Sequence, residues 1–315
     1  MQRLGTLAVV VNDFSDPYFA EVVRATSAAA SQAGLLTMVC SSERNSEIEL
    51  NNLAMLRQTR VAAVLFAGGG IANTEHERRI AALAREIRSY GGAVVALAPR
   101  SERWPAEVCD NRGGAAMAAR HLLELGHRYI VTITGPCHVR SSTERDAGYR
   151  DVLSAVRPEW SRAVGDFTYD GGQRAAAELL ATSTPFTAVL VANDAMAMGA
   201  LAEFRQQGIS VPGDVSVIGF GDVAAVRYLS PALTTVRVPA AEIAAAGVRR
   251  ALEILEGRAS EPRVRVHPVE LVVRESTAAL SFSYSRATRS TARAGPPGPR
   301  AGVRARPRQP AIAPR

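Results

Sequence analysis

Short runs of apolar residues alternate with amphipathic stretches along most of the chain. The runs have the length of buried strands, and between them apolar residues recur every three or four positions, as on one face of a helix. The strands expected from this pattern lie at 7–11, 35–40, 61–67, 93–98, 129–134, 164–168, 188–192 and 215–220, and the helices at 17–33, 47–60, 74–90, 113–125, 145–155, 172–181 and 194–207. Continuous apolar strands separated by helices are typical of parallel sheets that helices cover on both faces.

Residues at the ends of these segments support the same assignment. Gly34, Gly91, Gly126 and Gly208 each lie where an expected helix ends and the chain turns toward a strand, which is a common position for a C-terminal helix cap. Asp194 directly precedes an apolar helical stretch, and aspartate is a favoured N-cap residue. We therefore interpret Asp194 mainly as a helix cap.

The strands fall into two groups, which predicts two domains, or lobes. Four of them precede residue 110 and the others follow residue 128. The length of 315 residues is enough for two doubly wound lobes of similar size, each with its own core. Ligands of such sheets bind outside the carboxyl ends of the strands. The cleft between two facing lobes is therefore the expected binding site.

The C-terminal segment differs in composition from the rest of the chain. Residues 282–315 are rich in Arg, Pro, Ala and Gly and show no apolar periodicity, so we expect a disordered tail. Eight arginines and no acid follow residue 285, and without them the net charge of +7 becomes −1. The part expected to fold is therefore not a basic nucleic-acid platform. An inert extension and a phosphate-binding segment both fit the tail.

Cysteine and histidine patterns give no sign of a metal site or a disulfide framework. The three cysteines lack CxxC spacing, and the five histidines lack HxxxH or HExxH spacing. We expect no metal and no cofactor, and a reduced, cytoplasmic protein. The first apolar run is shorter than the core of a secretory signal, and no run has the length of a membrane helix.

Eight segments stand out in order along the chain. They are LGTLAVVVNDFSDPYFAEVVRATSAAASQAG, RVAAVLFAG, DNRGGAAMAARHLLELGHRYIVTITGP, RDAGYRDVL, VLVANDAMAMGAL, VPGDVSVIGFGD, SPALTTVRVP and VELVVRES. In this order they resemble the effector-binding core of LacI/GalR-type transcriptional regulators, a fold shared with periplasmic sugar-binding proteins. Each match is weak by itself, whereas eight in the same order and spacing are specific, and the resemblance covers about residues 4–277.

The resemblance implies a fold of the type I periplasmic-binding-protein kind, in which the chain crosses three times between two doubly wound parallel-sheet lobes. The crossings are expected near Asp110, Val238 and His267. The N-terminal lobe would comprise residues 1–110 and 238–266. The C-terminal lobe would comprise residues 111–237 and 267–281, with the tail at 282–315.

The first candidate ligand-binding residues follow the first strand. Tyr18 and Phe19 match ligand-facing positions of the family, and their flat faces suit a sugar or a purine, although core packing is the simpler role. Asn12 and Asp16 lie on the same loop and can form hydrogen bonds. Asp16 occupies a position where the family usually has Asn, so an N-cap role fits it nearly as well.

Further candidates come from the expected second lobe. Arg145 matches the family arginine that reaches into the cleft, where its guanidinium could bind vicinal hydroxyls or a carboxylate, and Ser141 lies four residues before it. Phe167 matches an aromatic cleft wall. Asn193 ends a strand, and its amide can both donate and accept, as a hydroxylated ligand requires.

The segment GFGD departs from the family pattern. The family often has an acid at the position of Gly221, where it accepts hydrogen bonds from sugar hydroxyls, and Asp222 follows as the last candidate residue. Without that acid, the cleft lacks a strong acceptor for neutral sugars and a charge that would repel an anion. With Arg145 nearby, a sugar acid or another anionic metabolite becomes a plausible effector.

The resemblance implies the ligand-sensing core of a homodimeric regulator that binds a sugar or sugar-acid-like effector. The family's DNA-binding helix-turn-helix would precede residue 1, so we expect no operator binding by these residues alone. The alternative is a solute-binding protein of a sugar transporter, which has the same fold but needs an export signal. An enzyme is disfavoured because GxSxG, P-loop and GxGxxG motifs are missing.

Overall fold

Two predominantly parallel sheets, each covered by helices on both faces, make up the described part of the chain. The computed structural model describes residues 5–100, 104–156, 160–182, 184–258 and 263–280. The tail expected to be disordered from residue 282 lies outside these ranges.

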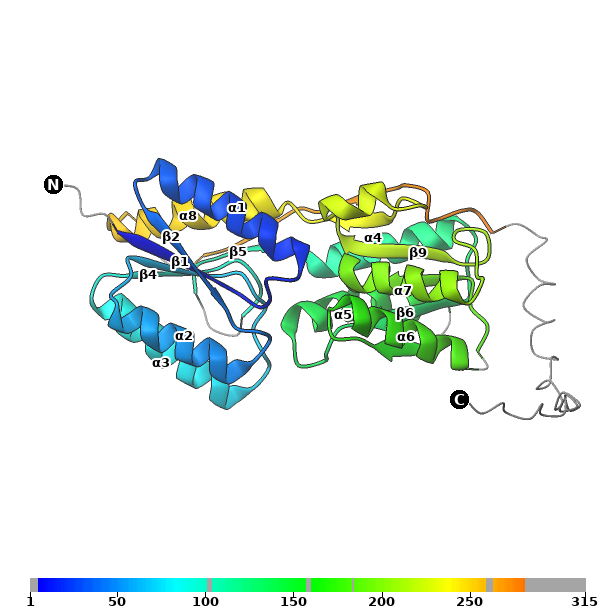
Figure 1. Ribbon diagram of the computed structural model, residues 1–315, viewed down its shortest axis with the longest axis horizontal. Helices are drawn as coiled ribbons and strands as arrows, with labels where there is room; N and C mark the ends of the chain where they lie inside the picture. Colours follow the sequence, from blue (N-terminus) through cyan, green and yellow to red (C-terminus); the bar gives the residue numbers. More distant parts are fainter. Residues whose placement is uncertain (1–4, 101–103, 157–159, 183, 259–262, 281–315) are drawn as a thin grey trace, which may run out of the picture. The chain divides into compact units, whose positions relative to one another are not determined.

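The first sheet has strand order β11-β5-β4-β3-β1-β2, and all of its strands are parallel. Helices α1 and α8 cover one face, and α2 and α3 cover the other (Figure 1). The strands are β1 (Thr6–Val11), β2 (Leu36–Ser41), β3 (Ala63–Phe66), β4 (Ala93–Ala96), β5 (Ala106–Cys109) and β11 (Val264–His267), and the helices are α1 (Pro17–Gln32), α2 (Ser46–Gln58), α3 (Thr74–Ser89) and α8 (Ala240–Leu255).

The alternation of side chains along β1 explains why this strand is apolar throughout. Leu7, Val9 and Val11 join the cluster that contains residues of α1 and α8. Ala8 and Val10 join the cluster that contains residues of α2 and α3. Because successive side chains of a strand point to opposite faces, a strand between two helix layers must be apolar at every position.

The second sheet has strand order β12-β10-β9-β8-β6-β7, with β12 antiparallel to β10 and the other pairs parallel. Its core lies on both faces: α4 and α5 contribute to one cluster, and α6 and α7 to the other. The strands are β6 (Ile130–Thr134), β7 (Arg162–Val164), β8 (Ala188–Val191), β9 (Ser216–Gly221), β10 (Thr234–Arg237) and β12 (Glu270–Val272), and the helices are α4 (Asn111–Glu124), α5 (Arg140–Leu153), α6 (Tyr169–Ala181), α7 (Asp194–Gln206) and the 3-10 helix η1 (Ala224–Tyr228).

The chain passes between the two sheets three times. It leaves the first sheet after β5, returns to it after β10 through α8, and crosses again between β11 and β12. The predicted fold class, two doubly wound parallel-sheet lobes joined by three crossovers, is therefore confirmed. The carboxyl ends of β1, β3, β4, β8 and β9 all lead into loops, which become important at the site.

Some element boundaries differ from those expected. Strand β5 was not among the four strands expected before residue 110; it is short and contains the charged residue Glu107, so it gives no apolar run. Helix α5 begins at Arg140 rather than Arg145, and no side chain caps it. Helices α4 and α6 each begin earlier than expected because the side chains of Asp110 and Thr168 cap them.

Two glycines allow α6 and α7 to pack closely. A Cβ atom on Gly172 would lie 2.1 Å from the carbonyl oxygen of Met196, and one on Gly199 would lie 2.0 Å from that of Tyr169. Both contacts are with backbone, which cannot swing away as a flexible side chain could. The separation of these helices is therefore fixed by the absence of side chains at these positions.

We predict that Gly172→Ala destabilises the protein by about 1–3 kcal/mol despite the better helix propensity of alanine, because the two helices must move apart. Urea unfolding followed by circular dichroism measures the change. The matched control is Glu178→Ala on the exposed side of the same helix, which should change stability by less than about 0.5 kcal/mol. A Gly172→Ala protein as stable as the control would contradict the prediction.

Candidate functional site

A cavity of about 80 Å³ lies between the two lobes, at the carboxyl ends of their strands. The loops after β1, β3, β4, β8 and β9 all contribute to its wall, as expected for ligand sites of parallel sheets. Of the nine residues predicted from the sequence, the structure brings eight together in this wall and leaves out Asp222. The eight are Asn12, Asp16, Tyr18, Phe19, Ser141, Arg145, Phe167 and Asn193.

The start of α1 positions two aromatic rings in the cavity wall. Pro17 occupies the first helical turn, and the side chain of Asp16 caps the helix by accepting from the backbone N–H of Tyr18 at 3.0 Å. The rings of Tyr18 and Phe19 meet edge to face, with centroids 5.3 Å apart. Burial raises the pKa of Tyr18, so its phenol stays neutral and can donate a hydrogen bond.

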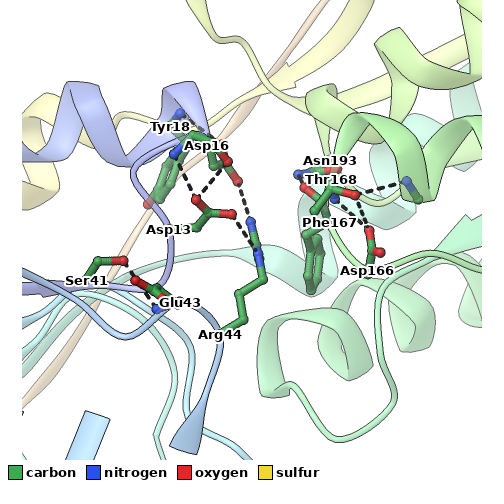
Figure 2. Close-up of polar contacts among 12 residues, drawn as sticks. Asp13, Asp16, Tyr18, Ser41, Glu43, Arg44, Asp166, Phe167, Thr168 and Asn193 are labelled. Atoms are coloured by element: carbon green, nitrogen blue, oxygen red, sulfur yellow. Dashed lines mark hydrogen bonds and ion pairs between the residues drawn. The ribbon is translucent and has the colours of Figure 1, made fainter. Parts of the chain in front are cut away.

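Arg44 was not predicted, yet it links two acids of the first lobe with the ring of Phe167 in the second (Figure 2). Its Nε donates to Asp13 at 3.2 Å, and its Nη2 lies 3.5 Å from an oxygen of Asp16. Its guanidinium carbon lies 5.9 Å from the centre of the Phe167 ring, within the range of a cation–π contact. The available signal was its position just after β2, the neighbour of β1 in the sheet.

The two acids beside Arg44 have opposite pKa shifts. Burial raises the pKa of Asp16, and this outweighs the hydrogen bond from Tyr18 and the charge of Arg44. Burial acts on Asp13 in the same direction, but hydrogen bonds from Ser15 and the charge of Arg44 lower its pKa overall. Asp13 is therefore the firmer anionic partner of Arg44.

Asn193 uses its amide to hold the opposite wall in place. Its Oδ1 accepts from the backbone N–H of Met196 at 3.0 Å, which caps α7, and its Nδ2 donates to the carbonyl oxygen of Phe167 at 3.0 Å. Phe167 has a φ of +69°, a left-handed conformation that is unfavourable for an aromatic residue. The hydrogen bond from Asn193 fixes that conformation. The prediction that Asp194 caps α7 was wrong, because Asn193 is the cap.

Arg145 lies against the second lobe and forms no direct ion pair, and the nearest acid, Glu144, reaches it only through Asn111. Its Nε donates to Asn111 Oδ1 at 2.9 Å, its Nη1 donates to the carbonyl oxygen of Ala192 at 2.5 Å, and its guanidinium carbon lies 4.0 Å from the centre of the Phe220 ring. Asn111 is held in turn by Glu144, to which it donates at 2.8 Å. Within the described residues, no carboxylate forms an ion pair with Arg145.

Asp194 is a buried acid whose oxygens are both used by the protein. One accepts from the hydroxyl of Thr235 at 2.6 Å, and the other accepts from the backbone N–H of Val223 at 2.9 Å. Burial is the main cause that raises its pKa from an ordinary 3.8 to about 6, although both hydrogen bonds oppose the shift. The nearby Asp222 raises it further.

Asp222 lies off the cavity, and its carboxylate is taken up by arginines. The side chain is fully buried and contacts Arg274, Arg237 and Arg227, with Arg237 Nε at 2.6 Å. Arg237 ends β10, just before the chain crosses back to the first lobe, and Arg274 follows β12. The placement therefore supports a structural role for Asp222 in joining these two segments.

Gly221 shows why the second lobe has no acid at the position where the family often has one. Its φ of +142° favours glycine, and a Cβ atom there would lie 3.1 Å from an oxygen of Asp194. An aspartate at this position would meet both backbone strain and a second buried acid. The backbone at position 221 and the neighbouring Asp194 therefore favour glycine over an acid at this position.

Comparison with known proteins identifies the chain. The periplasmic binding protein-like domain family matches residues 119–277. The HTH-type transcriptional regulator GalR of Salmonella typhimurium is 34% identical over 268 residues, which cover 84% of this chain and 76% of GalR. The chain belongs to the LacI/GalR family of transcriptional regulators.

Solved structures agree with this assignment. A complex of the transcriptional regulator CelR with cellobiose is 30% identical, with a TM-score of 0.75 and coverage of 86% of this chain and 84% of CelR. A dimeric Lac repressor with a C-terminal deletion is 25% identical, with a TM-score of 0.78 and coverage of 87% and 100%. The chain is therefore the ligand-sensing core of a transcriptional regulator rather than an enzyme or a transporter's solute-binding protein.

The described residues form neither a candidate metal site nor a membrane-spanning helix. Within the described ranges, histidine, cysteine and acidic side chains form no group of three or more that could hold a metal ion. None of the helices that the structure describes is long and apolar enough to cross a membrane.

We predict that Asp194→Asn changes how stability depends on pH. Because the folded-state pKa of about 6 exceeds the unfolded value near 3.8, the folded wild type binds more protons between these values, and its stability falls as pH rises through that window. The Asp194→Asn variant cannot ionise at this position, so its stability does not fall in this way. It should be more stable than wild type by up to about 3 kcal/mol at pH 7.5, with the gap narrowing toward pH 4.5. Urea unfolding at both pH values tests this, and a constant gap would contradict it.

We predict that Asp222→Asn destabilises the fold by about 2–3 kcal/mol and leaves ligand affinity within about twofold, because three arginines lose a buried partner that lies off the cavity. Urea unfolding gives the first quantity, and calorimetric titration with any ligand of the wild type gives the second. The control is Asp170→Asn, an exposed acid in the first turn of α6. A large loss of affinity with unchanged stability would instead make Asp222 a ligand contact.

Proposed function

We propose that this regulator core senses a sugar that carries an acid group, bound in the cleft between its lobes. The observation that carries the proposal is Arg145, a cation in the cavity wall that forms no ion pair with a described carboxylate and feels the charge of Glu144 only across Asn111. A ligand carboxylate would supply the missing charge. Charge-assisted hydrogen bonds to a guanidinium are among the strongest polar contacts that a protein can offer.

The other charged groups of the cavity support an acidic ligand. Arg44 already has Asp13 and Asp16 as partners. Both oxygens of Asp194 accept hydrogen bonds from protein groups, which leaves this acid poorly placed to bind sugar hydroxyls. Gly221 contributes no side chain. Arg145 is therefore the charged group with the most to gain from a ligand.

The remaining wall suits the carbon skeleton and hydroxyls of a sugar. Tyr18, Phe19, Phe167 and Phe220 present aromatic surface to the cavity, and such surfaces pack against the C–H faces of sugar rings. The side chains of Asn12 and Ser141 also line it and form no hydrogen bond with other described residues. They are thus free to bind hydroxyls.

We further propose that the core works as a homodimer in the cytoplasm and controls the affinity of a helix-turn-helix domain for operator DNA. The name of GalR as an HTH-type regulator and the dimeric state of the Lac repressor support this. Strand β2, at an edge of the first sheet, leaves Leu36 and Met38 exposed, an apolar surface that a second copy could cover. A ligand would act by favouring one arrangement of the lobes.

A thermal-shift comparison of acidic and neutral sugars tests the ligand class. Gluconate, glucuronate and galacturonate are compared with sorbitol, glucose and galactose. We predict that at least one acid raises Tm by about 5 °C at a hundredfold excess over its Kd, while its neutral counterpart does not. Binding of neutral sugars alone, with no response to any acid, would overturn the proposal.

Variants of Arg145 test whether the acid group of the ligand binds at this residue. Arg145→Ala should abolish the shift, and Arg145→Lys should weaken affinity about tenfold or more because it keeps the charge but loses the two-pronged geometry. Arg120→Ala, which removes an exposed arginine of α4, is the matched control and should bind like wild type. Equal binding by Arg145→Ala and the control would place the acid elsewhere.

A further inference from the structure

A second cavity opens beside the first and shares part of its wall. We call the first cavity the inner compartment and this one, of about 60 Å³, the outer compartment. The five residues lining both are Asn12, Arg44, Gly69, Val139 and Phe167. Arg44 and Phe167, which contact each other (Figure 2), are among these shared residues, so the two compartments adjoin at this contact.

The size of the compartments indicates what each can hold. At about 10–15 Å³ for each water molecule in such a measure, the inner compartment has room for roughly five to eight waters and the outer for roughly four to six. Each space is therefore comparable to one sugar unit with its hydroxyls, and neither is large enough for two. A ligand that fills the whole cleft must have two joined units.

The outer compartment is built from residues of both lobes. A β-bridge between Ile71 and Val139 joins the lobes at its wall. Beside the bridge, Ala72 N–H donates to the carbonyl oxygen of His138 at 2.7 Å, and Arg140 N–H donates to that of Gly70 at 3.1 Å. An occupant of this space would thus contact the two lobes at the place where they are already joined.

Charges in the outer compartment are neutralised by the protein itself. Glu49, which is buried, contacts both Arg100 and His76, the latter at 2.8 Å. Burial would raise the pKa of Glu49, but these two partners lower it to about 2. Asp166 pairs with Arg174 at 2.7 Å. Unlike the inner compartment with Arg145, this space therefore offers no unpaired charge to an ionic group.

Uncharged polar groups, in contrast, are available there. The hydroxyl of Ser42, the Nδ2 of Asn45 and the ring of His138 make no hydrogen bond with other described residues. Such a mixture of donors and acceptors matches hydroxyl groups, which can both donate and accept.

We propose that the effector is an acidic sugar joined to a second, neutral sugar unit, with the acid-bearing unit in the inner compartment and the neutral unit in the outer one. This inference rests on the proposed function, because it takes the acidic ligand of Arg145 as its starting point. It adds the second unit and assigns that unit to Ser42, Asn45 and His138. The protein thus selects its ligand by length as well as by charge.

Calorimetric titration with matched one-unit and two-unit acids tests the inference. The pairs are gluconate with lactobionate and glucuronate with cellobiouronate, and lactitol serves as the neutral analogue of lactobionate. We expect the two-unit acid of at least one pair to bind about tenfold or more tightly than its one-unit partner, and lactitol to bind weakly. Equal affinity within both pairs would overturn the proposal of a second sugar unit. The proposal that the ligand is acidic would still stand. Absence of binding by all four acids would overturn the proposed function and this inference together.

Variants of residues that line the outer compartment assign the difference to it. Ser42→Leu should reduce the affinity for the two-unit acid about tenfold or more and leave the one-unit acid within about twofold, because Ser42 lines the outer compartment alone. Ser31→Leu, at an exposed position near the end of α1, is the matched control. Since Ser42 is buried, His138→Ala at an exposed position provides a second variant, which removes a polar group of the outer compartment and spares the core. If both variants bind the two-unit acid like the control, the outer compartment is not its site.

Discussion

The positive charge of Arg145 is the constraint around which the cleft is organised. Its guanidinium contacts Asn111 at the first crossover, the carbonyl oxygen of Ala192 after β8 and the ring of Phe220 in β9. One side chain from α5 thus ties together three separate parts of the second lobe. Its direct contacts are all uncharged, and Glu144 acts on it only through Asn111, so an anion bound in the cleft would gain a favourable partner.

The parallel sheets determine where this charge and its neighbours can lie. Because all strands but β12 run parallel, their carboxyl ends gather at one edge of each sheet. Asn193 then converts a loop into a fixed wall by capping α7 and holding Phe167 in a left-handed conformation. The fold supplies the location, while a few side-chain hydrogen bonds supply the shape.

The sequence predicted the two-lobed architecture through local patterns that survive folding, and it identified most of the eight candidate residues through the resemblance to the LacI/GalR family. Apolar runs reflect burial between helix layers, and residues after strands must lie near the cleft. The sequence did not predict side-chain positions that depend on contacts between residues far apart in the chain. Asp222 meets arginines that lie up to 52 positions away in the chain, and Arg44 meets Phe167 in the other lobe. The apolar pattern did not predict strand β5, because Glu107 interrupts it. In the folded protein, His267 lies 2.6 Å from Glu107, a contact that the pattern does not reveal.

Asn193 and Asp194 illustrate a finer limit. Both are good capping residues, and only the backbone geometry decides that Asn193 caps the helix while Asp194 turns to Val223 and Thr235. Sequence preference identifies the helix start within a residue but not the side chain that serves it. These separate roles matter because they leave the carboxylate of Asp194, rather than the amide of Asn193, buried beside Gly221.

The contact between Gly221 and Asp194 has an evolutionary consequence. A descendant of this protein that gains an acid at position 221 must also adjust the backbone and the nearby Asp194, which lies 3.1 Å from where a Cβ would lie. The two positions are therefore expected to change together or not at all. Ligand preference in this lineage would then shift through paired mutations, and the order in which they arise would decide which intermediates still fold.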